Sequence, residues 1–423
     1  MNRRMRKTSL SLLAVSVFAL TACNESDDKT LQPIESVTEP TLVSFAKLDV
    51  ETYAEGLDSG RDVRGANGIF PPFSGQPVQG FSAALKQPDG TYLVMSDNGF
   101  GSQDNSSDYL LRLHHLSSDF RTKAGGTATV KHLSYIQLRD PNKLIPFEIV
   151  HQNTQERLLT GADFDPESMQ RAPNGDIWIG DEFGPYLLHF SADGILKSPP
   201  IALAHPLEAG TELRSPQNQL NKGTTGYIDG YIEPLVQRSG GFEGMAISPN
   251  GRYLYPLLEK PLLNATTPQL IISEFDLEKK VYTRNFYYFE LASKASAIGD
   301  FQLFSAKEGV IIERDDSENN LGGYKKLIKV RLNQSGESVA REELVNLMDL
   351  ANPDLLYGPV RPGDLATGQR FGFPFQTIED IIIEGPDLIT VLNDNNFPGS
   401  SGRNRNLADD NEIIQIRLAQ ALY

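Results

Sequence analysis

The stretch Asp165–Pro185 (DPESMQRAPNGDIWIGDEFGP) decides the fold, because it has the pattern of a strand, a tight turn and a second strand that ends in acid. The first strand contains Glu167, the turn lies at residues 173–175 (PNG), and the second strand runs into the pair Asp181-Glu182. A Pro-Asn-Gly sequence between apolar runs is typical of a β-turn. The stretch therefore predicts a β-hairpin that carries carboxylates at one end.

The same pattern recurs four more times, at residues 81–99, 241–261, 297–316 and 377–396. Short runs rich in Val, Ile, Leu, Tyr and Phe surround the copies and are bounded by Gly, Pro, Asn and Asp. Repeats of roughly 40–80 residues with four strands each are typical of a β-propeller. We therefore predict an all-β fold, a β-propeller of four-stranded blades with five blades evident and up to seven possible. A β-sandwich and a β-helix array are the alternatives.

The last copy lacks a fourth strand. Residues 377–418 supply three strand-like runs, whereas residues 41–51 (TLVSFAKLDVE) form a strand-like run with no partner nearby in the sequence. We expect this N-terminal strand to complete the last blade and close the ring. Helical patterns are rare, and residues 341–350 are a candidate for one short helix.

The N-terminal residues predict a secretory signal. A basic start precedes an apolar run at 10–20, which is too short to cross a bilayer. Residues 20–23 (LTAC) resemble the bacterial lipobox, whose cysteine becomes the lipidated N-terminus, and Cys23 is the sole cysteine of the chain. A secreted protein with a chance cysteine is the alternative. We expect a lipoprotein signal peptide at 1–22, a polar, acidic tether at 23–40 and a single propeller domain at 41–423.

The resemblance to lipoproteins also implies a location. The residue after the cysteine, Asn24, is not Asp, which favours the outer membrane. We therefore expect a protein of the cell envelope, attached to the membrane through a lipid on Cys23 and facing the periplasm or the cell surface.

The charge balance excludes nucleic acid as a partner. Without residues 1–22, 35 Lys and Arg stand against 55 Asp and Glu, a net charge near −20. Binding to nucleic-acid phosphates needs a basic face. Solubility is one explanation of the surplus acid, and clustered carboxylates that bind cations are the other. We expect a monomer without a disulfide inside the chain.

Acids at the strand ends are the candidate metal ligands. In a propeller the innermost strands line a central channel, and the ends of the next strands reach one rim, so repeated acids would converge there. Like charges held close raise each other's pKa unless a cation lies between them. Oxygen-rich clusters favour Ca²⁺, with Mg²⁺ as the alternative. The predicted metal ligands are Asp97, Asp181, Glu182, Glu259, Glu313, Asp380 and Asp394.

Basic residues beside these acids predict an anionic substrate. Lys260 and Arg314 each follow a predicted ligand, and a loop rich in Gly, Ser and Asn at 398–406 contains two further arginines. Cations in such positions can neutralise a phosphate. The predicted catalytic residues are Glu167, Glu243, Lys260 and Arg314, with one of the two glutamates as base, and the predicted substrate-binding residues are Arg403 and Arg405. The sequence has no nucleophile elbow, phosphate-binding loop or dinucleotide fingerprint.

The chain resembles the phytase-like family, described as the esterase-like activity of phytase. The matching phrases are FSAALKQPDGTYLVMSDNG (81–99), LTGADFDPESMQRAPNGDIWIGDEFGPYLLHFSADG (159–194), GFEGMAISPNGRYLYPLLEKPL (241–262), VIIERD (310–315), TIEDI (377–381) and LNDNNFP (392–398). The resemblance implies phosphoester hydrolysis outside the cytoplasm, and a kinship with calcium-dependent β-propeller phytases in architecture and acidic lining. Function taken from kinship of folds is an analogy.

Three functions are compatible with these features. The first is a Ca²⁺-dependent phosphoester hydrolase that acts on a small phosphoester. The second is a calcium-dependent lactonase or carboxylesterase. The third is a non-catalytic surface propeller that binds a partner or glycan, in which Ca²⁺ braces the ring.

Overall fold

The computed structural model describes residues 36–221 and 231–423, of which Val37–Tyr423 form one compact unit. The predicted signal peptide, Cys23 and most of the predicted tether lie outside the described residues. The described residues form strands, turns and loops and contain no helix. Accordingly, none of their segments is a helix with the length and apolar character needed to cross a membrane. The expected all-β class is confirmed.

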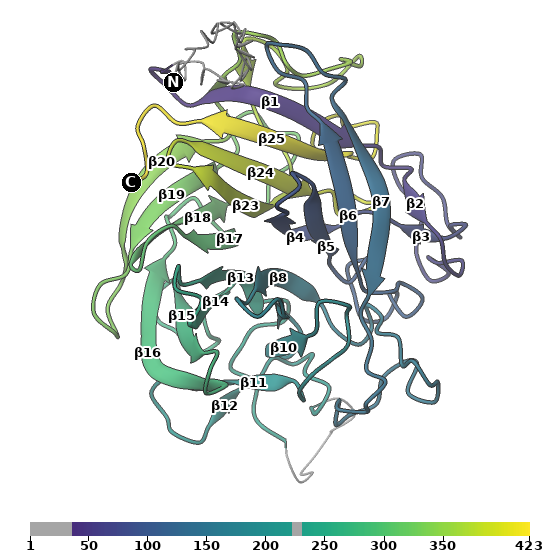
Figure 1. Cartoon of the computed structure of the whole chain (residues 1–423), viewed down its shortest axis with the longest axis vertical. Coiled ribbons are helices and arrows are strands. Elements are labelled where there is room, and N and C mark those ends of the chain that lie inside the picture. The colour runs from purple at the N-terminus through teal and green to yellow at the C-terminus, as the bar shows by residue number, and fades with distance from the viewer. Residues whose placement is uncertain (1–35, 222–230) are drawn as a thin grey trace, which may run out of the picture. The chain divides into compact units, whose positions relative to one another are not determined.

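Five antiparallel groups of four or five strands, which we call sheets I to V, build the unit (Figure 1), and the first and last of them are joined at one edge into a single larger sheet. Sheet I contains β4 (Phe81–Lys86), β5 (Tyr92–Ser96), β6 (Arg112–Asp119) and β7 (Thr129–Gln137). Sheet II contains β8 (Pro166–Arg171), β9 (Ile177–Asp181), β10 (Tyr186–Phe190), β11 (Ile201–Ala204) and the short β12 (Glu212–Leu213). Sheet III contains β13 (Phe242–Ile247), β14 (Tyr253–Leu258), β15 (Gln269–Asp276) and β16 (Val281–Glu290).

The other two sheets complete the set. Sheet IV contains β17 (Ala297–Leu303), β18 (Glu308–Arg314), β19 (Lys325–Arg331) and β20 (Ala340–Asn346). Sheet V contains β23 (Thr377–Gly385), β24 (Leu388–Asp394), β25 (Asn411–Arg417) and β1 (Thr41–Leu48). Two short pairs add to these strands. β2 (Tyr53–Ala54) with β3 (Gln76–Pro77) forms a separate small sheet, whereas β21 (Leu350–Ala351), paired with β22 (Arg370–Phe371), joins sheet V through one parallel pair with β1.

The N-terminal strand completes the last sheet, as expected from the sequence. β1 pairs antiparallel with β25 from Thr41 opposite Arg417 to Leu48 opposite Asn411. On its other edge β1 meets sheet I through one parallel pair, Lys47 with Thr129. The first and last parts of the described chain are therefore joined by a continuous ladder of backbone hydrogen bonds.

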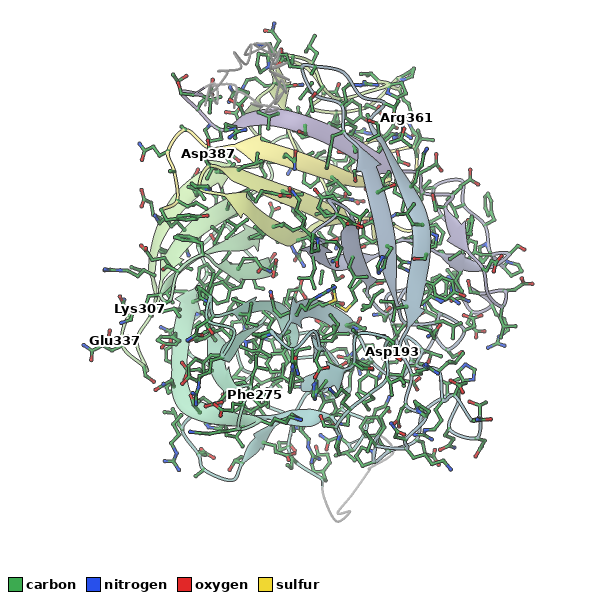
Figure 2. All side chains as sticks on the ribbon, viewed as in Figure 1. Asp193, Phe275, Lys307, Glu337, Arg361 and Asp387 are labelled. Atoms are coloured by element: carbon green, nitrogen blue, oxygen red, sulfur yellow. The ribbon has the colours of Figure 1, made fainter. Side chains whose placement is uncertain are left out.

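The five innermost strands surround a common centre. β4 contacts β8, β8 contacts β13, β13 contacts β17, β17 contacts β23, and β23 returns to β4. Figure 1 shows these strands facing one another at the middle of the unit. Five buried hydrophobic clusters fill the five interfaces between neighbouring sheets. Phe275, for example, is fully buried between sheets II and III (Figure 2).

Both faces of the inner strands are buried, which explains their apolar runs. In β9, Ile177 and Ile179 pack toward sheet I, whereas Trp178 packs toward sheet III. Successive side chains of a strand point to opposite faces, so a strand between two neighbours needs apolar residues at almost every position. The outermost strands β7, β16 and β20 carry most of the exposed strand residues.

The prediction of a short helix at residues 341–350 was wrong. Residues 340–346 form β20, in which Val345 pairs with Leu327 of β19 and is buried. The run of Arg and Glu at 341–343 favours a helix by intrinsic propensity. Pairing with the free edge of β19 overrides that preference, because it satisfies the backbone groups of both strands.

Candidate active site

The innermost strands carry a β-bulge at the same point of the repeat. The ladder between β8 and β9 passes over Glu167, and the ladder between β13 and β14 passes over Glu243. The equivalent shifts pass over Glu379 in sheet V and Ser82 in sheet I. A bulge re-aims the side chain of the extra residue. The bulged side chains meet at the centre, where the Ser82 hydroxyl donates a hydrogen bond of 3.0 Å to Glu379 Oε2.

The second strands contribute a further set of charged residues. In each sheet, the residue before the bulge pairs with a residue on the second strand, and the next residue along that strand is charged. These equivalent residues are Asp97, Glu182, Glu259, Arg314 and Asp394. Four sheets thus supply an acid at this position, and sheet IV supplies an arginine.

We use "acidic ring" for the carboxylates that these positions and one loop bring together, all buried except the partly exposed Asp97: Asp97, Asp165, Glu167, Glu182, Glu243, Glu259, Glu379 and Asp394. Asp165 precedes β8 and is held by Asn98, whose backbone N–H and side-chain Nδ2 donate to it over 3.1 and 2.7 Å. The loop after β5 therefore positions an acid of sheet II.

Two groups of three carboxylates within the ring are close enough to share a cation. Oxygens of Asp165, Glu167 and Glu182 lie within 4.8 Å of one another, and so do oxygens of Glu182, Glu243 and Glu259. Glu182 belongs to both groups. All of these donors are hard oxygens, which suit Ca²⁺ or Mg²⁺. The residues present therefore fit a divalent cation of this kind.

Arg314 lies among the acids as a counter-charge. Its Nη2 donates to Glu243 Oε1 and Glu259 Oε1, each at 3.3 Å, and to Glu379 Oε1 at 3.4 Å. Its Nη1 reaches Asp316 at 3.1 Å. One guanidinium thus links sheets III, IV and V at the centre.

Lys260 is the second cation of the site. Its Nζ lies 2.7 Å from Glu259 Oε2 and also donates to the Ser239 carbonyl. Burial acts to lower the pKa of Lys260, but Glu259, Glu182 and Glu243 outweigh it and raise the pKa above the ordinary value. Lys260 therefore stays charged beside the acids.

The site holds more negative charge than its two cations balance. Burial, reinforced by neighbouring carboxylates, raises the pKa of Asp97, Glu167, Glu182 and Glu243 well above the usual range. Burial and Asp394 raise the pKa of Glu379 to about 8, and burial raises the pKa of Asp394 to about 6. Such a cluster binds either protons or cations at neutral pH.

Three predicted metal ligands lie beside the ring but outside its groups of three. Asp181 accepts hydrogen bonds from the backbone N–H of Asp165 and of Gly184, so both of its oxygens brace the loop that carries Glu182. Glu313 pairs with Arg341 at 2.6 Å and accepts a hydrogen bond from Tyr324 at 2.7 Å. Asp380 is buried, and neither oxygen has a hydrogen-bond partner among the described residues.

The structure does not bring the two predicted substrate-binding arginines into the acidic ring. Arg403 is 1% exposed and pairs with Glu412 through Nε at 3.0 Å and Nη2 at 2.7 Å. Its guanidinium also lies over the ring of Tyr357. Arg405 is exposed and donates to Asn319. Their contacts make Arg403 a structural residue and tie Arg405 to a neighbouring loop.

Sequence reasoning missed two members of the ring, Asp165 and Glu379. The phrases around the bulges read PES, FEG and IED at 166–168, 242–244 and 378–380. Aligning them places Glu379 with Glu167 and Glu243, so this signal was available. Asp165 has no counterpart in the other repeats and could be found only from the contact with Asn98.

Comparison with known proteins identifies a family. The sequence model described as "Phytase-like: Esterase-like activity of phytase" matches residues 76–397, which is most of the chain. No curated protein matches the sequence.

Solved structures give weak similarities. A periplasmic gluconolactonase of Pseudomonas aeruginosa is 12% identical, with 89% of this chain and all of that chain covered and a TM-score of 0.33. Regucalcin, a calcium-binding protein of Agrobacterium tumefaciens, is 13% identical, with coverages of 81% and 79% and a TM-score of 0.32. A luciferin-regenerating enzyme is 10% identical, with coverages of 82% and 79% and a TM-score of 0.34. Likeness at this level carries no argument about activity.

Proposed function

The chain belongs to the phytase-like family, and from this premise we propose that it is a divalent-cation-dependent phosphoester hydrolase built on a five-bladed β-propeller. The observation that carries the proposal is the convergence of carboxylates from four sheets, among which residues of sheets II and III form two groups of three that share Glu182. The family match supports a hydrolase. The closed ring of contacts between innermost strands supports the propeller.

The chain's own residues divide into ligands and counter-charges. Asp165, Glu167 and Glu182 would hold one cation, and Glu182 with Glu243 and Glu259 would hold a second. When bound, Ca²⁺ or Mg²⁺ supplies Lewis acidity toward a phosphoryl oxygen. Because Glu182 belongs to both groups, its loss would weaken both sites at once.

One of these ligands would also move a proton, and the two cationic side chains would neutralise charge and hold the ring in place. Glu167 is 9% exposed, more than the other residues of the two groups of three, and accepts the proton of the attacking water in our proposal. Lys260 lies at the edge of the ring, partly exposed, where it can neutralise phosphate charge. Arg314 holds Glu243, Glu259 and Glu379 in place through its three hydrogen bonds.

One observation favours a second candidate, a lactonase or carboxylesterase. The Arg314 guanidinium is already bonded to three ring carboxylates, and the Lys260 ammonium lies against Glu259. Little positive charge remains for a phosphate dianion, whereas a neutral ester needs none. Both candidates use the same cation sites and differ in substrate.

Turnover of a matched substrate panel tests the proposal. With Ca²⁺ present, we expect the domain 37–423 to hydrolyse 4-nitrophenyl phosphate and to lose this activity on chelation. Hydrolysis of a γ-lactone or 4-nitrophenyl acetate, with no phosphate release, would replace the first candidate by the second. Cation binding without turnover of any of these substrates would indicate the non-catalytic alternative.

Glu182→Gln is the informative variant, and Glu313→Gln is its matched control. Both glutamates are buried on the second strand or its end, but Glu313 is paired with Arg341 outside the ring. We expect Glu182→Gln to lower the turnover rate by about a hundredfold, the scale of losing one electrostatic catalytic group. Glu313→Gln should lower stability and leave the affinity for Ca²⁺ unchanged. Equal losses of activity in the two variants would contradict the assignment of Glu182.

The cellular setting is also a proposal. The lipobox-like LTAC sequence supports a lipid anchor on Cys23 and a location in the cell envelope, on the periplasmic or surface side of the outer membrane. We propose that the protein acts there as a monomer. Labelling with a radioactive fatty acid, compared between the wild type and Cys23→Ser, tests the anchor.

A further inference from the structure

A pocket of about 400 Å³ lies beside the acidic ring, between the loops that follow β5 and β24. Asp97, a member of the ring, is part of its lining, together with residues 99–101 and 396–399. Asn98, which lies between these lining residues, holds Asp165 of the first carboxylate group. The pocket therefore borders, at Asp97, the place where we propose that hydrolysis occurs.

The floor of the pocket is apolar and fixed by packing. Phe100 and Phe397 line it and are 7% and 5% exposed. Behind them Phe73 packs against both, with ring centroids 6.0 Å from Phe100 and 5.0 Å from Phe397. Tyr109 supports Phe100 from the other side at 5.2 Å. The floor is thus formed before any ligand binds, which limits the entropy lost on binding.

Arg64 brings a positive charge to this pocket. It lines the pocket and is exposed, and within residues 36–221 and 231–423 its guanidinium has no hydrogen bond or ion pair. Its loop is anchored to the opposite wall, because Asn67 Nδ2 donates to the carbonyls of Pro398, Gly399 and Ser400 over 2.8–3.3 Å. Arg64 is therefore held at the pocket by its backbone and left with all of its donors available.

Arg61, three residues earlier, differs from Arg64 because its guanidinium has partners in the structure. Its Nε lies 3.4 Å from Asp62, its Nη2 donates to Ser107, and it lines a different pocket. Asp62, the acid nearest to Arg64 in the sequence, also lines the pocket, and its carboxylate lies 3.4 Å from Arg61 rather than against Arg64.

We propose that this pocket holds the leaving group of the substrate and that Arg64 recognises an anionic group, such as a carboxylate, on an apolar, ring-sized leaving group. The inference rests on the proposed function for the identity of the reaction, and it adds which substrates are preferred. An arginine presents paired donors that match a carboxylate or phosphate. The aromatic floor suits an apolar ring, and Asp97 marks the side on which the scissile bond lies.

Binding of two phosphonates, which cannot be hydrolysed, tests the proposal separately from turnover. Phenylphosphonate and 4-carboxyphenylphosphonate differ only in the carboxylate that Arg64 would contact. With the Ca²⁺-loaded domain, we expect calorimetry to give roughly tenfold tighter binding of the carboxylated ligand, as for one hydrogen-bonded charge. Arg64→Gln should abolish this gain, whereas Arg61→Gln should retain it.

Two results would overturn the inference: an equal affinity of the wild type for both phosphonates, or a gain that survives in Arg64→Gln. A different result would contradict the proposed function itself, namely that neither phenyl phosphate nor 4-carboxyphenyl phosphate is hydrolysed. If those esters are hydrolysed, the preference in kcat/KM for the carboxylated ester should also disappear in Arg64→Gln and persist in Arg61→Gln. Because both arginines are exposed, neither variant is expected to disturb folding.

Discussion

Adjacent acidic residues have different roles in this protein. Glu182 enters the ring while Asp181 braces its loop, and Glu379 enters it while Asp380 lies beside it with no hydrogen-bond partner in the described part of the chain. The sequence predicted that each such pair would lie near the centre, and several pairs do. It could not predict which member enters, because a one-residue bulge reverses the alternation of side chains along a strand.

Arg314 illustrates a residue whose position could be predicted but whose contacts could not. It occupies in sheet IV the position that an acid occupies in the other four sheets. The sequence placed it next to an acid of its own strand, Glu313, as a cation for phosphate. In the structure Glu313 pairs with Arg341, and Arg314 bonds three carboxylates from two other sheets.

Arg314→Met should therefore change stability and cation binding in opposite directions. Removing one partner of a buried ion pair costs about 3–5 kcal/mol, because the remaining charges lose their compensation. We expect a lower Tm in chelator and a higher affinity for Ca²⁺, since the cation then neutralises the carboxylates that the guanidinium has left. Differential scanning calorimetry with and without Ca²⁺ measures both effects.

Arg403→Met is the control for this variant. Arg403 is equally buried and pairs with one carboxylate, Glu412, outside the ring. The Arg403→Met variant should lose stability to a similar degree, and its affinity for Ca²⁺ should not change. A parallel change of affinity in both variants would show that Arg314 acts through general stability alone.

The bulged innermost strand is the element on which the site depends. Each bulge lies where the strand crosses the centre, so the extra residue and the end of the second strand bring two side chains per sheet to one place. Turn residues and apolar runs in the sequence located both strands. The bulge itself leaves little trace in a single repeat, and it becomes visible only when the repeats are aligned.

Gly299 shows how tightly these strands approach. It lies in the bulge of β17, and a Cβ built on it would lie 1.9 Å from the Ile378 carbonyl oxygen of β23. Gly299→Ala must push the two innermost strands apart. We expect this to lower the free energy of unfolding by about 3 kcal/mol, the upper range for overpacking. Because Arg314 of sheet IV bonds Glu379 of sheet V, the separation should also lower the affinity for Ca²⁺ or alter its enthalpy.

Gly385→Ala provides the comparison within the same pair of elements. Gly385 ends β23, and a Cβ there would meet nothing within 4 Å. In urea unfolding, the free energy of unfolding of this variant should lie within about 0.5 kcal/mol of the wild-type value. If Gly299→Ala is equally mild, the close approach of β17 and β23 is not a constraint on the site.

Closure of the whole ring is what makes the site possible. Asp97 and Asp394 are far apart in the sequence, yet Asp394 adds to desolvation in raising the pKa of Asp97, because sheets I and V are neighbours. Repeats and the unpartnered N-terminal strand were enough to predict this closure. The number of blades stayed open in the sequence because residues 50–80, 139–161 and 205–240 could each have held an irregular blade. In the structure the first of these ranges contributes only the short pair of β2 with β3.

The summed charge of the closed ring predicts how the whole domain responds to pH. Burial and neighbouring acids hold the pKa of Glu379 at about 8 and raise the pKa of Glu167, Glu182 and Glu243 above their unfolded values. Between the unfolded and folded pKa values the folded state carries more protons, so the free energy of unfolding falls as the pH rises. The slope is up to about 1.4 kcal/mol per pH unit for each such group.

In chelator we therefore expect the Tm of residues 37–423 to fall as the pH rises from 5 to 8, the window between the ordinary pKa of Glu and the value of about 8 for Glu379. Ca²⁺ should reverse this trend, because the deprotonated carboxylates that destabilise the free ring are the ligands that bind the cation. Glu379→Gln should flatten the slope in chelator, since it removes one titrating group from the cluster. A Tm that does not depend on pH in chelator, and that Ca²⁺ leaves unchanged at pH 8, would mean that the carboxylates do not form a shared site.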